Sequence, residues 1–148
     1  MRILVINGPN LNLLGKRQPQ VYGKKTLEQI NALLKKRAKE LGVELGFFQS
    51  NSEGSLIDFI QAEAPRASAI VINPGALTHY GLSLRDALAD AGIPIIEVHI
   101  SNIYAREEWR AKSVMTPIAK AQISGLGWRG YLIALETLAA EGQKGISA

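Results

Sequence analysis

The sequence contains no cysteine, and this absence excludes disulfides, thiolate metal sites and cysteine nucleophiles. A chain without cysteine also suits a reducing compartment, so we predict a cytoplasmic protein. Histidine occurs only twice, too rarely for a typical zinc site unless carboxylates join as ligands. No GxSxG segment is present, which argues against a serine nucleophile of the α/β-hydrolase type.

Long apolar runs and concentrated basic segments are also missing. No stretch approaches the ~20 apolar residues that span a bilayer, and the N-terminal residues show no signal-peptide pattern, so we expect no membrane association. The net charge of +4 is too small and too dispersed to predict nucleic-acid binding, although it suits a small anionic ligand. The 148 residues are 47% apolar, which is enough for a sizeable core and predicts a single catalytic domain covering 1–148.

Strand-like and helix-like segments alternate along this domain. We expect strands at 2–7, 43–48, 69–73, 94–100 and 120–125, and helices at 27–41, 53–64, 82–91 and 128–141. Several strands are almost continuously apolar, as parallel strands covered on both faces are. The pattern predicts an α/β, flavodoxin-like, open five-stranded parallel sheet with helices on both faces. Residues 145–148 are interpreted as a frayed tail.

Three motif resemblances fail on inspection. GPNLNLLGKR resembles a phosphate-binding loop, but six residues separate Gly8 from Gly15, more than a Walker loop allows. GLGWRG at 125–130 matches GxGxxG but precedes the last helix, so we interpret its glycines as turn and packing residues. A phospho-receiver domain needs carboxylates at its strand ends, where Asn7 and Asn73 stand instead.

Polar side chains follow three of the predicted strands, where parallel α/β sheets bind ligands. They are Asn7, Asn10, Asn12, Arg17 and Tyr22 after the first strand, Asn73 and His79 after the third, and Glu97, His99, Ser101, Asn102, Arg106 and Arg110 along and after the fourth. Singly, each could serve only to satisfy loop backbone groups. Because both histidines belong to adjacent strand ends, the set favours an active site.

The available side chains indicate proton-transfer chemistry. Histidine titrates near neutrality, whereas tyrosine, with an ordinary pKa of ~10, is a poor base unless a cation stabilises its phenolate. Arg17 would have this effect on Tyr22, on a loop over 15–23 able to close over a substrate. Glu97 and His99 are two residues apart on a strand, share one face and should touch. The residues alone predict an α/β enzyme that acts on a small anion, with a lysine Schiff base left open.

Four segments carry a resemblance to a known family. In order they are ILVINGPNLNLLGKRQPQVYG, FFQSNSEGSLID, INPGALTHYGLSLRDAL and IPIIEVHISNIYAREEWR. They closely resemble the type II 3-dehydroquinate dehydratases of the shikimate pathway of aromatic amino acid biosynthesis, from Arg2 to the last helix. The resemblance implies an anti elimination of water from 3-dehydroquinate through an enolate, with no cofactor and no metal.

The same resemblance implies a role for each catalytic position. Tyr22 is the base that removes a proton alpha to the ketone, and Arg17 keeps it ionised. A water near Asn12 holds the enolate oxygen. His99 protonates the departing hydroxyl as general acid, and Glu97 orients it.

Further positions are implied to bind the substrate. These are Asn73 and the backbone amides of Ile100 and Ser101 for the carboxylate, and His79 and Arg110 for the ring hydroxyls. The resemblance also implies a homododecamer, a tetramer of trimers, in which Asp86 of a neighbouring subunit completes the site. From sequence alone, Asp86 three residues after Ser83 is equally compatible with a helix-capping acid.

The chain departs from the family pattern at positions outside the predicted catalytic set. Ser52 stands where histidine is common, Leu77 where an aromatic is common, and Tyr80 replaces a smaller or more polar residue. We expect these changes to affect site shape, subunit packing or affinity. Two alternatives remain: a flavodoxin-like hydrolase or isomerase of another small carboxylate, and a non-enzymatic flavin or nucleotide binder.

Overall fold

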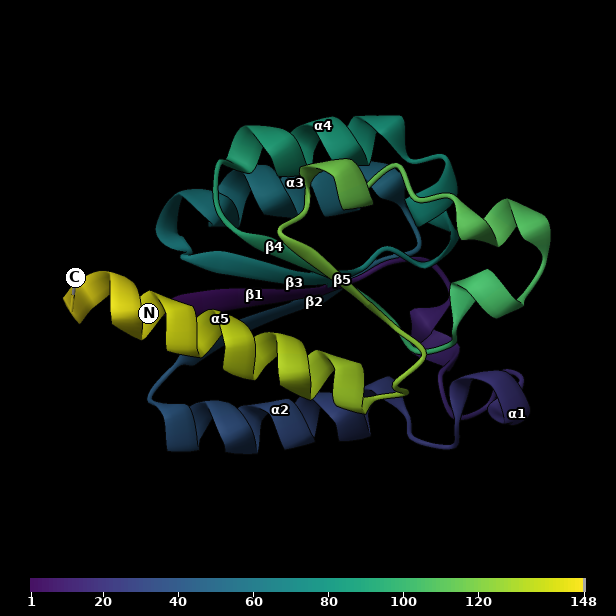
Figure 1. The fold of residues 1–148 in the computed structure, drawn as a ribbon, viewed down its shortest axis with the longest axis horizontal. Helices are drawn as coiled ribbons and strands as arrows, with labels where there is room; N and C mark the ends of the chain where they lie inside the picture. Colours follow the sequence, from purple (N-terminus) through teal and green to yellow (C-terminus); the bar gives the residue numbers. More distant parts are fainter. Residues whose placement is uncertain (148) are drawn as a thin grey trace.

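The computed structural model describes residues 1–147, and the side chains of residues 1–144. Its centre is a five-stranded parallel sheet in the order β2-β1-β3-β4-β5, which Figure 1 shows as the middle layer. The strands are β1 (Arg2–Asn7), β2 (Glu44–Gln49), β3 (Ala69–Asn73), β4 (Ile95–His99) and β5 (Ala121–Ser124). The predicted flavodoxin-like sheet is therefore confirmed.

Helices cover both faces of the sheet, as predicted. The helices α2 (Leu27–Leu41) and α5 (Arg129–Ser147) lie on one face, and α3 (Glu53–Glu63) and α4 (Leu82–Ala91) on the other (Figure 1). A fifth helix, α1 (Pro19–Tyr22), is a single turn within the long segment that follows β1. The sequence indicated only a loop there, because one turn is too short to show helical periodicity.

The alternation of side chains along the strands explains the nearly continuous apolar runs. Ile3 and Val5 belong to the core beneath α2 and α5, while Leu4 and Ile6 belong to the core beneath α3 and α4. Successive strand residues point to opposite faces, and both faces are covered here. Apolar residues therefore suit both sets of positions, and β1 is buried from Ile3 onward, with Asn7 at its end as a buried polar residue.

The helix ends follow local rules that the sequence contains. At α2 the Thr26 hydroxyl accepts from the Gln29 N–H (3.1 Å), and the Gln29 side chain accepts from the Thr26 N–H (2.9 Å), the predicted capping box. Gly42, with φ of 70°, ends the helix in the left-handed conformation that glycine favours.

The last helix differs from its predicted extent. It begins at Arg129 rather than 128 and continues to Ser147 rather than ending near 141. Gly142 lacks the positive φ of Gly42, so it does not stop the helix. Residues 145–147, predicted as a frayed tail, are therefore helical, and Ala148 lies outside the described residues.

Glycine in the GLGWRG segment has the packing role that we expected. A Cβ atom on Gly130 would lie 3.1 Å from Val98 Cγ1 and 3.3 Å from Ile123 Cγ2, so the start of α5 sits close against the sheet. Gly125 and Gly127 take positive φ values of 90° and 62° in the turn before it.

A buried tyrosine ties the carboxyl ends of the two central strands together. Asn7 and Asn73 are paired residues of β1 and β3. The Tyr131 hydroxyl of α5 donates to Asn7 Oδ1 (2.6 Å) and accepts from Asn73 Nδ2 (2.9 Å). Burial raises the pKa of Tyr131 and outweighs the opposing effect of the Asn73 hydrogen bond, so the hydroxyl remains a donor.

We predict that Tyr131→Phe lowers the free energy of unfolding by about 1–3 kcal/mol, because Asn7 Oδ1 and Asn73 Nδ2 lose the partner that the Tyr131 hydroxyl supplies. Urea denaturation measures the change. Tyr104→Phe is a matched control: Tyr104 is 56% exposed and its hydroxyl bonds only to Gln122, so a change within about 0.5 kcal/mol is expected. Equal losses in both variants would contradict the role given to Tyr131.

Candidate active site

A cavity opens at the carboxyl ends of β1, β3 and β4. Its lining brings together most of the residues that the sequence singled out: Asn10, Arg17, Tyr22, Asn73, His79, His99, Ile100, Ser101, Arg106 and Arg110. The single turn α1 and the irregular segment after β4 lie at this same end of the sheet, opposite the chain termini (Figure 1). The topology therefore gathers loops from three strands around one hollow.

Glu97 and His99 form a buried pair on β4. Glu97 is fully buried and His99 is 5% exposed. The His99 Nε2 atom lies 2.5 Å from Glu97 Oε2, which confirms the contact predicted from strand alternation. Since a carboxylate only accepts, Nε2–H donates, and Nδ1 is left as the ring nitrogen available to a ligand in the cavity.

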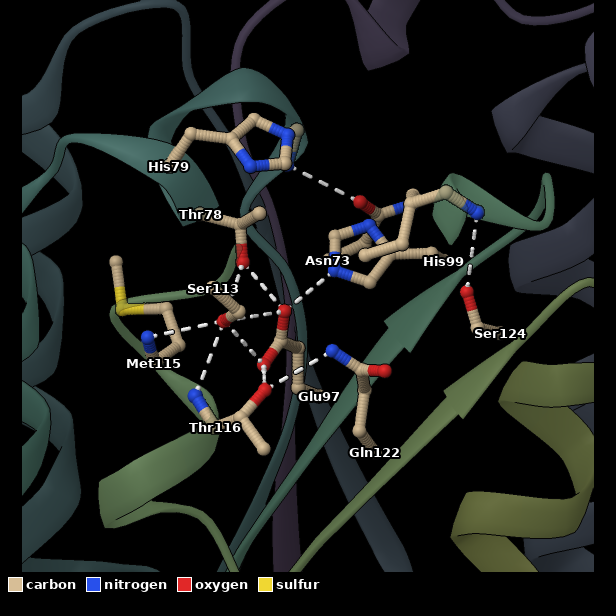
Figure 2. A network of polar contacts seen from close by, with 12 residues as sticks. Asn73, Thr78, His79, Glu97, His99, Ser113, Met115, Thr116, Gln122 and Ser124 are labelled. Carbon is tan, nitrogen blue, oxygen red and sulfur yellow. Dashed lines mark hydrogen bonds and ion pairs between the residues drawn. The ribbon is translucent and has the colours of Figure 1, made fainter. Parts of the chain in front are cut away.

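Hydroxyl groups surround the Glu97 carboxylate on its other sides. Thr78 donates to Oε2, Thr116 donates to Oε1 at 2.9 Å, and Ser113 Oγ lies 2.9 Å from Oε1 and 3.0 Å from Oε2. Figure 2 shows these side chains converging on Glu97 from two segments of the chain, one with Thr78 and one with Ser113 and Thr116.

The hydrogen bonds decide the ionisation of this carboxyl. Burial raises the pKa of Glu97, but the hydrogen bond and charge of His99, with the hydroxyls of Thr78 and Thr116, outweigh burial and place the pKa below its ordinary value. Glu97 is thus a carboxylate at neutral pH, and a negative charge stands beside the His99 ring.

Two arginines contact Tyr22 on the opposite side of the cavity. The Arg106 guanidinium donates to the Tyr22 hydroxyl (2.9 Å) and to Ser101 Oγ (3.2 Å), and it also lies 5.2 Å from the ring centroid. Arg17 lies over the ring at 5.2 Å, so it is beside Tyr22 as expected, although it contacts the ring face. The sequence placed Arg106 at this rim but gave it no role.

The remaining predicted binding residues are held by the scaffold. His79 Nδ1 donates to the Lys112 carbonyl oxygen (2.7 Å), which leaves Nε2 for the cavity. Asn73 Oδ1 accepts from the Gly75 N–H (3.1 Å) while its Nδ2 contacts Tyr131. The Arg110 guanidinium stacks over the Trp109 ring at 4.1 Å. Their orientations are therefore fixed before any ligand enters.

Asn12 is not among the residues that line the cavity. It lines a separate hollow with Thr26 and Asn31, because the short 3₁₀ turn Leu11–Leu13 directs its side chain away from His99. Asn10, with φ of 70°, lines the cavity instead. Asparagine tolerates this left-handed conformation better than most residues, but sequence alone does not tell which of the two asparagines faces inward.

Asp86 also lies outside the cavity lining. It is on α4, its side chain is 72% exposed, and its contact is Arg85 at 3.3 Å. The alternative interpretation as a capping acid paired with Ser83 is wrong, because α4 is capped at Gly81 with no side-chain cap and Ser83 already lies inside the helix.

Two features, a metal-binding cluster and a membrane-spanning helix, are absent from residues 1–147. Within this range, no group of three or more histidine, aspartate or glutamate side chains is placed to hold a metal ion. Likewise, none of the helices described is both long and apolar enough to cross a bilayer.

Comparison with known proteins finds a family profile and close relatives that match most of the chain. The sequence profile "Dehydroquinase class II" matches residues 1–139. A 3-dehydroquinate dehydratase of Roseiflexus castenholzii is 64% identical over 93% of this chain and 88% of the relative. One of Pelotomaculum thermopropionicum is 57% identical over 95% and 97%.

Solved structures agree with the sequence comparison. The type II dehydroquinase of Butyrivibrio crossotus superimposes with a TM-score of 0.91 at 47% identity, covering 93% of this chain and 97% of that one. These likenesses span nearly the whole of each protein and include the sheet, the helices and the cavity loops. The chain belongs to the class II dehydroquinase family.

Proposed function

We propose that this chain is a hydro-lyase that converts 3-dehydroquinate to 3-dehydroshikimate and water. One observation carries the proposal: His99, which is paired with the buried Glu97, and an arginine-bound Tyr22 line the same cavity. An elimination needs one group to take a proton and another to give one. The identity of the substrate is inferred from the relatives, which are named 3-dehydroquinate dehydratase.

Tyr22 is the proposed base. In the reaction its oxygen takes the proton alpha to the substrate ketone, and the electrons of that C–H bond form an enolate. The guanidinium of Arg106 donates to the hydroxyl and that of Arg17 lies over the ring, so two positive charges stand beside the proposed base. Arg106 therefore shares with Arg17 the role that the sequence gave to Arg17 alone.

His99 is the proposed general acid. Its Nδ1–H protonates the departing hydroxyl as the enolate collapses, so that the C–O bond breaks and water leaves. The Glu97 carboxylate accepts from Nε2–H, which orients the ring and places a negative charge beside it. Proton return from Tyr22 to His99 then restores both groups.

Asn10 is the proposed holder of the water that stabilises the enolate oxygen. The resemblance suggested a water near Asn12, but Asn10 lines the cavity and Asn12 does not. A polar group fixed in the cavity can stabilise an oxyanion without reorganising during the reaction. We therefore assign this role to Asn10 in place of Asn12.

The substrate carboxylate is proposed to bind Asn73 and the backbone amides of Ile100 and Ser101. His79 Nε2 and Arg110 then face the ring hydroxyls. The cavity in its present form has a volume of only about 60 Å³, below the range of small-molecule sites. Entry of the substrate thus requires the segment that carries Arg17 and Tyr22 to move outward.

We further propose the assembly of trimers into a cytoplasmic dodecamer. Leu82 and Asp86 are four residues apart on α4, so they share one helix face, and Leu82 is 61% exposed. A second subunit packed on this face would cover Leu82 and receive Asp86 in its cavity. The site within a single chain lacks this carboxylate.

The function is tested by mixing the protein with 3-dehydroquinate in chelator-containing buffer and following the ultraviolet absorbance of the conjugated product. We expect a rise that Tyr22→Phe reduces by about 100-fold or more in kcat, while calorimetry shows retained substrate binding. Tyr104→Phe, outside the cavity, should leave kcat unchanged. A flat trace from folded protein would overturn the function, and normal turnover by Tyr22→Phe would overturn the base.

The two asparagines give a matched comparison. Asn10→Gly removes the amide but keeps the left-handed backbone accessible, so we expect kcat to fall about 100-fold, as for loss of one oxyanion donor. Asn12→Gly, in the neighbouring turn, should change kcat by less than about twofold. Steady-state kinetics on both variants measures this difference, and the reverse order would return the role to Asn12.

The contribution of Asp86 across subunits is testable by complementation. Asp86→Ala and Tyr22→Phe proteins should each be nearly inactive alone. Coexpressed, they should recover roughly a quarter of wild-type activity, because a random symmetric mixture pairs half of the intact Tyr22 sites with a neighbour that has Asp86. Absence of recovery in mixed oligomers would mean that Asp86 acts within its own subunit, and an Asp86→Ala protein that is active alone would mean that Asp86 has no catalytic part.

A further inference from the structure

Ser113 occupies a position beside Glu97 that the reaction scheme above does not use. Its Oγ lies 2.9 Å and 3.0 Å from the two carboxylate oxygens. The same Oγ accepts from the backbone N–H groups of Met115 and Thr116, each at 3.0 Å. Figure 2 shows Ser113 at the centre of this network.

A count of hydrogens fixes the direction of the Ser113 hydroxyl. A serine oxygen has one hydrogen to donate and two lone pairs to accept with. The N–H groups of Met115 and Thr116 take both lone pairs. Thr78 Oγ1 also lies 3.2 Å from Ser113 Oγ, but Thr78 donates its own hydrogen to Glu97, and the Glu97 oxygens are nearer to Ser113, at 2.9 Å and 3.0 Å. The single hydrogen of Ser113 therefore points toward Glu97, where it is shared between the two carboxylate oxygens.

The same count applies to Glu97. Its carboxylate receives donors from Thr78, Ser113, Thr116 and His99, and a carboxylate offers about four lone-pair sites. A proton on either oxygen would face one of these donors. The arrangement is thus compatible only with the ionised form, which keeps the His99 Nε2–H as a donor.

The segment that carries Ser113 is attached to neighbouring elements on both sides. The Val114 N–H donates to the Thr78 carbonyl oxygen (2.7 Å), and the Lys112 carbonyl accepts from His79 (2.7 Å). The Gln122 side chain of β5 donates to Thr116 Oγ1 (2.9 Å). These hydrogen bonds fix the position of Ser113 relative to both histidines of the cavity.

We propose that Ser113 is a positioning residue of this enzyme: it holds the Glu97 carboxylate in the orientation that keeps His99 in place to deliver its proton. The proposal rests on the proposed role of His99 as general acid. Ser113 does not line the cavity, so it acts through Glu97 and not on the substrate. In the described part of the chain, His99 is the titratable side chain in contact with Glu97, whose other contacts are hydroxyls.

The proposal predicts a change in turnover rather than in binding. Ser113→Ala should lower kcat about tenfold with KM within twofold of wild type, as expected for loss of one hydrogen bond to a charged group. Without this donor the Glu97 carboxylate protonates more readily. The acidic limb of the kcat profile should then move about one unit toward neutral pH.

Two variants separate positioning from general stability. Ser113→Thr keeps the hydroxyl and should restore kcat and the pH profile. Ser52→Ala also removes a serine that accepts a backbone N–H, that of Ser55 (3.3 Å), but at the start of α3 and without a contact to Glu97. It should lower stability and leave the pH profile unchanged. A folded Ser113→Ala protein with wild-type kcat and pH profile overturns the proposal.

A measurement without substrate keeps the inference distinct from the proposed function. Nitrogen-15 spectra of the labelled histidine rings report the His99 tautomer and its titration, and Ser113→Ala should shift that titration. If the titration of His99 is unchanged in Ser113→Ala, the positioning role is overturned even if the enzyme acts on another substrate. If Ser113→Ala does not fold, Thr116→Val is tested in its place, because it removes a different donor to Glu97. It should shift the titration of His99 in the same direction.

Discussion

A fully buried carboxylate, that of Glu97, is the charge around which the carboxyl end of the sheet is arranged. An isolated buried charge would be very unfavourable, and it becomes acceptable only when hydrogen-bond donors replace the lost water. Here the donors come from β4 itself, from the 3₁₀ segment after β3, and from the segment leading to β5. Satisfying one side chain thus fixes the positions of two loops relative to β4.

On the opposite wall of the cavity, the charges that surround the key side chain are positive. Tyr22 sits on a single helical turn and is approached by two guanidinium groups, Arg17 and Arg106. A negative group stands beside the histidine, and positive groups stand beside the tyrosine. That separation suits a base on one side of a substrate and an acid on the other.

Regular structure could be predicted from the sequence because it is dictated locally. The capping box at Thr26, the glycine stop at Gly42 and the alternation that brings Glu97 to His99 all depend on neighbouring residues. Asn10, Arg106 and Ser113 could not be assigned in this way, because their directions depend on irregular turns. A shift of one or two residues in such a turn reverses which side chain faces inward, and no periodicity reports it.

Tyr131 links the first strand of the chain to its last helix through a bond that spans 124 residues of sequence. Contacts between such distant residues form late, since loop closure must precede them. During synthesis β1 and β3 leave the ribosome before α5, so the hydrogen bonds of Tyr131 can form only after α5 has followed them. Asn73, which lines the cavity, therefore gains its Tyr131 partner later than its partners within the sheet.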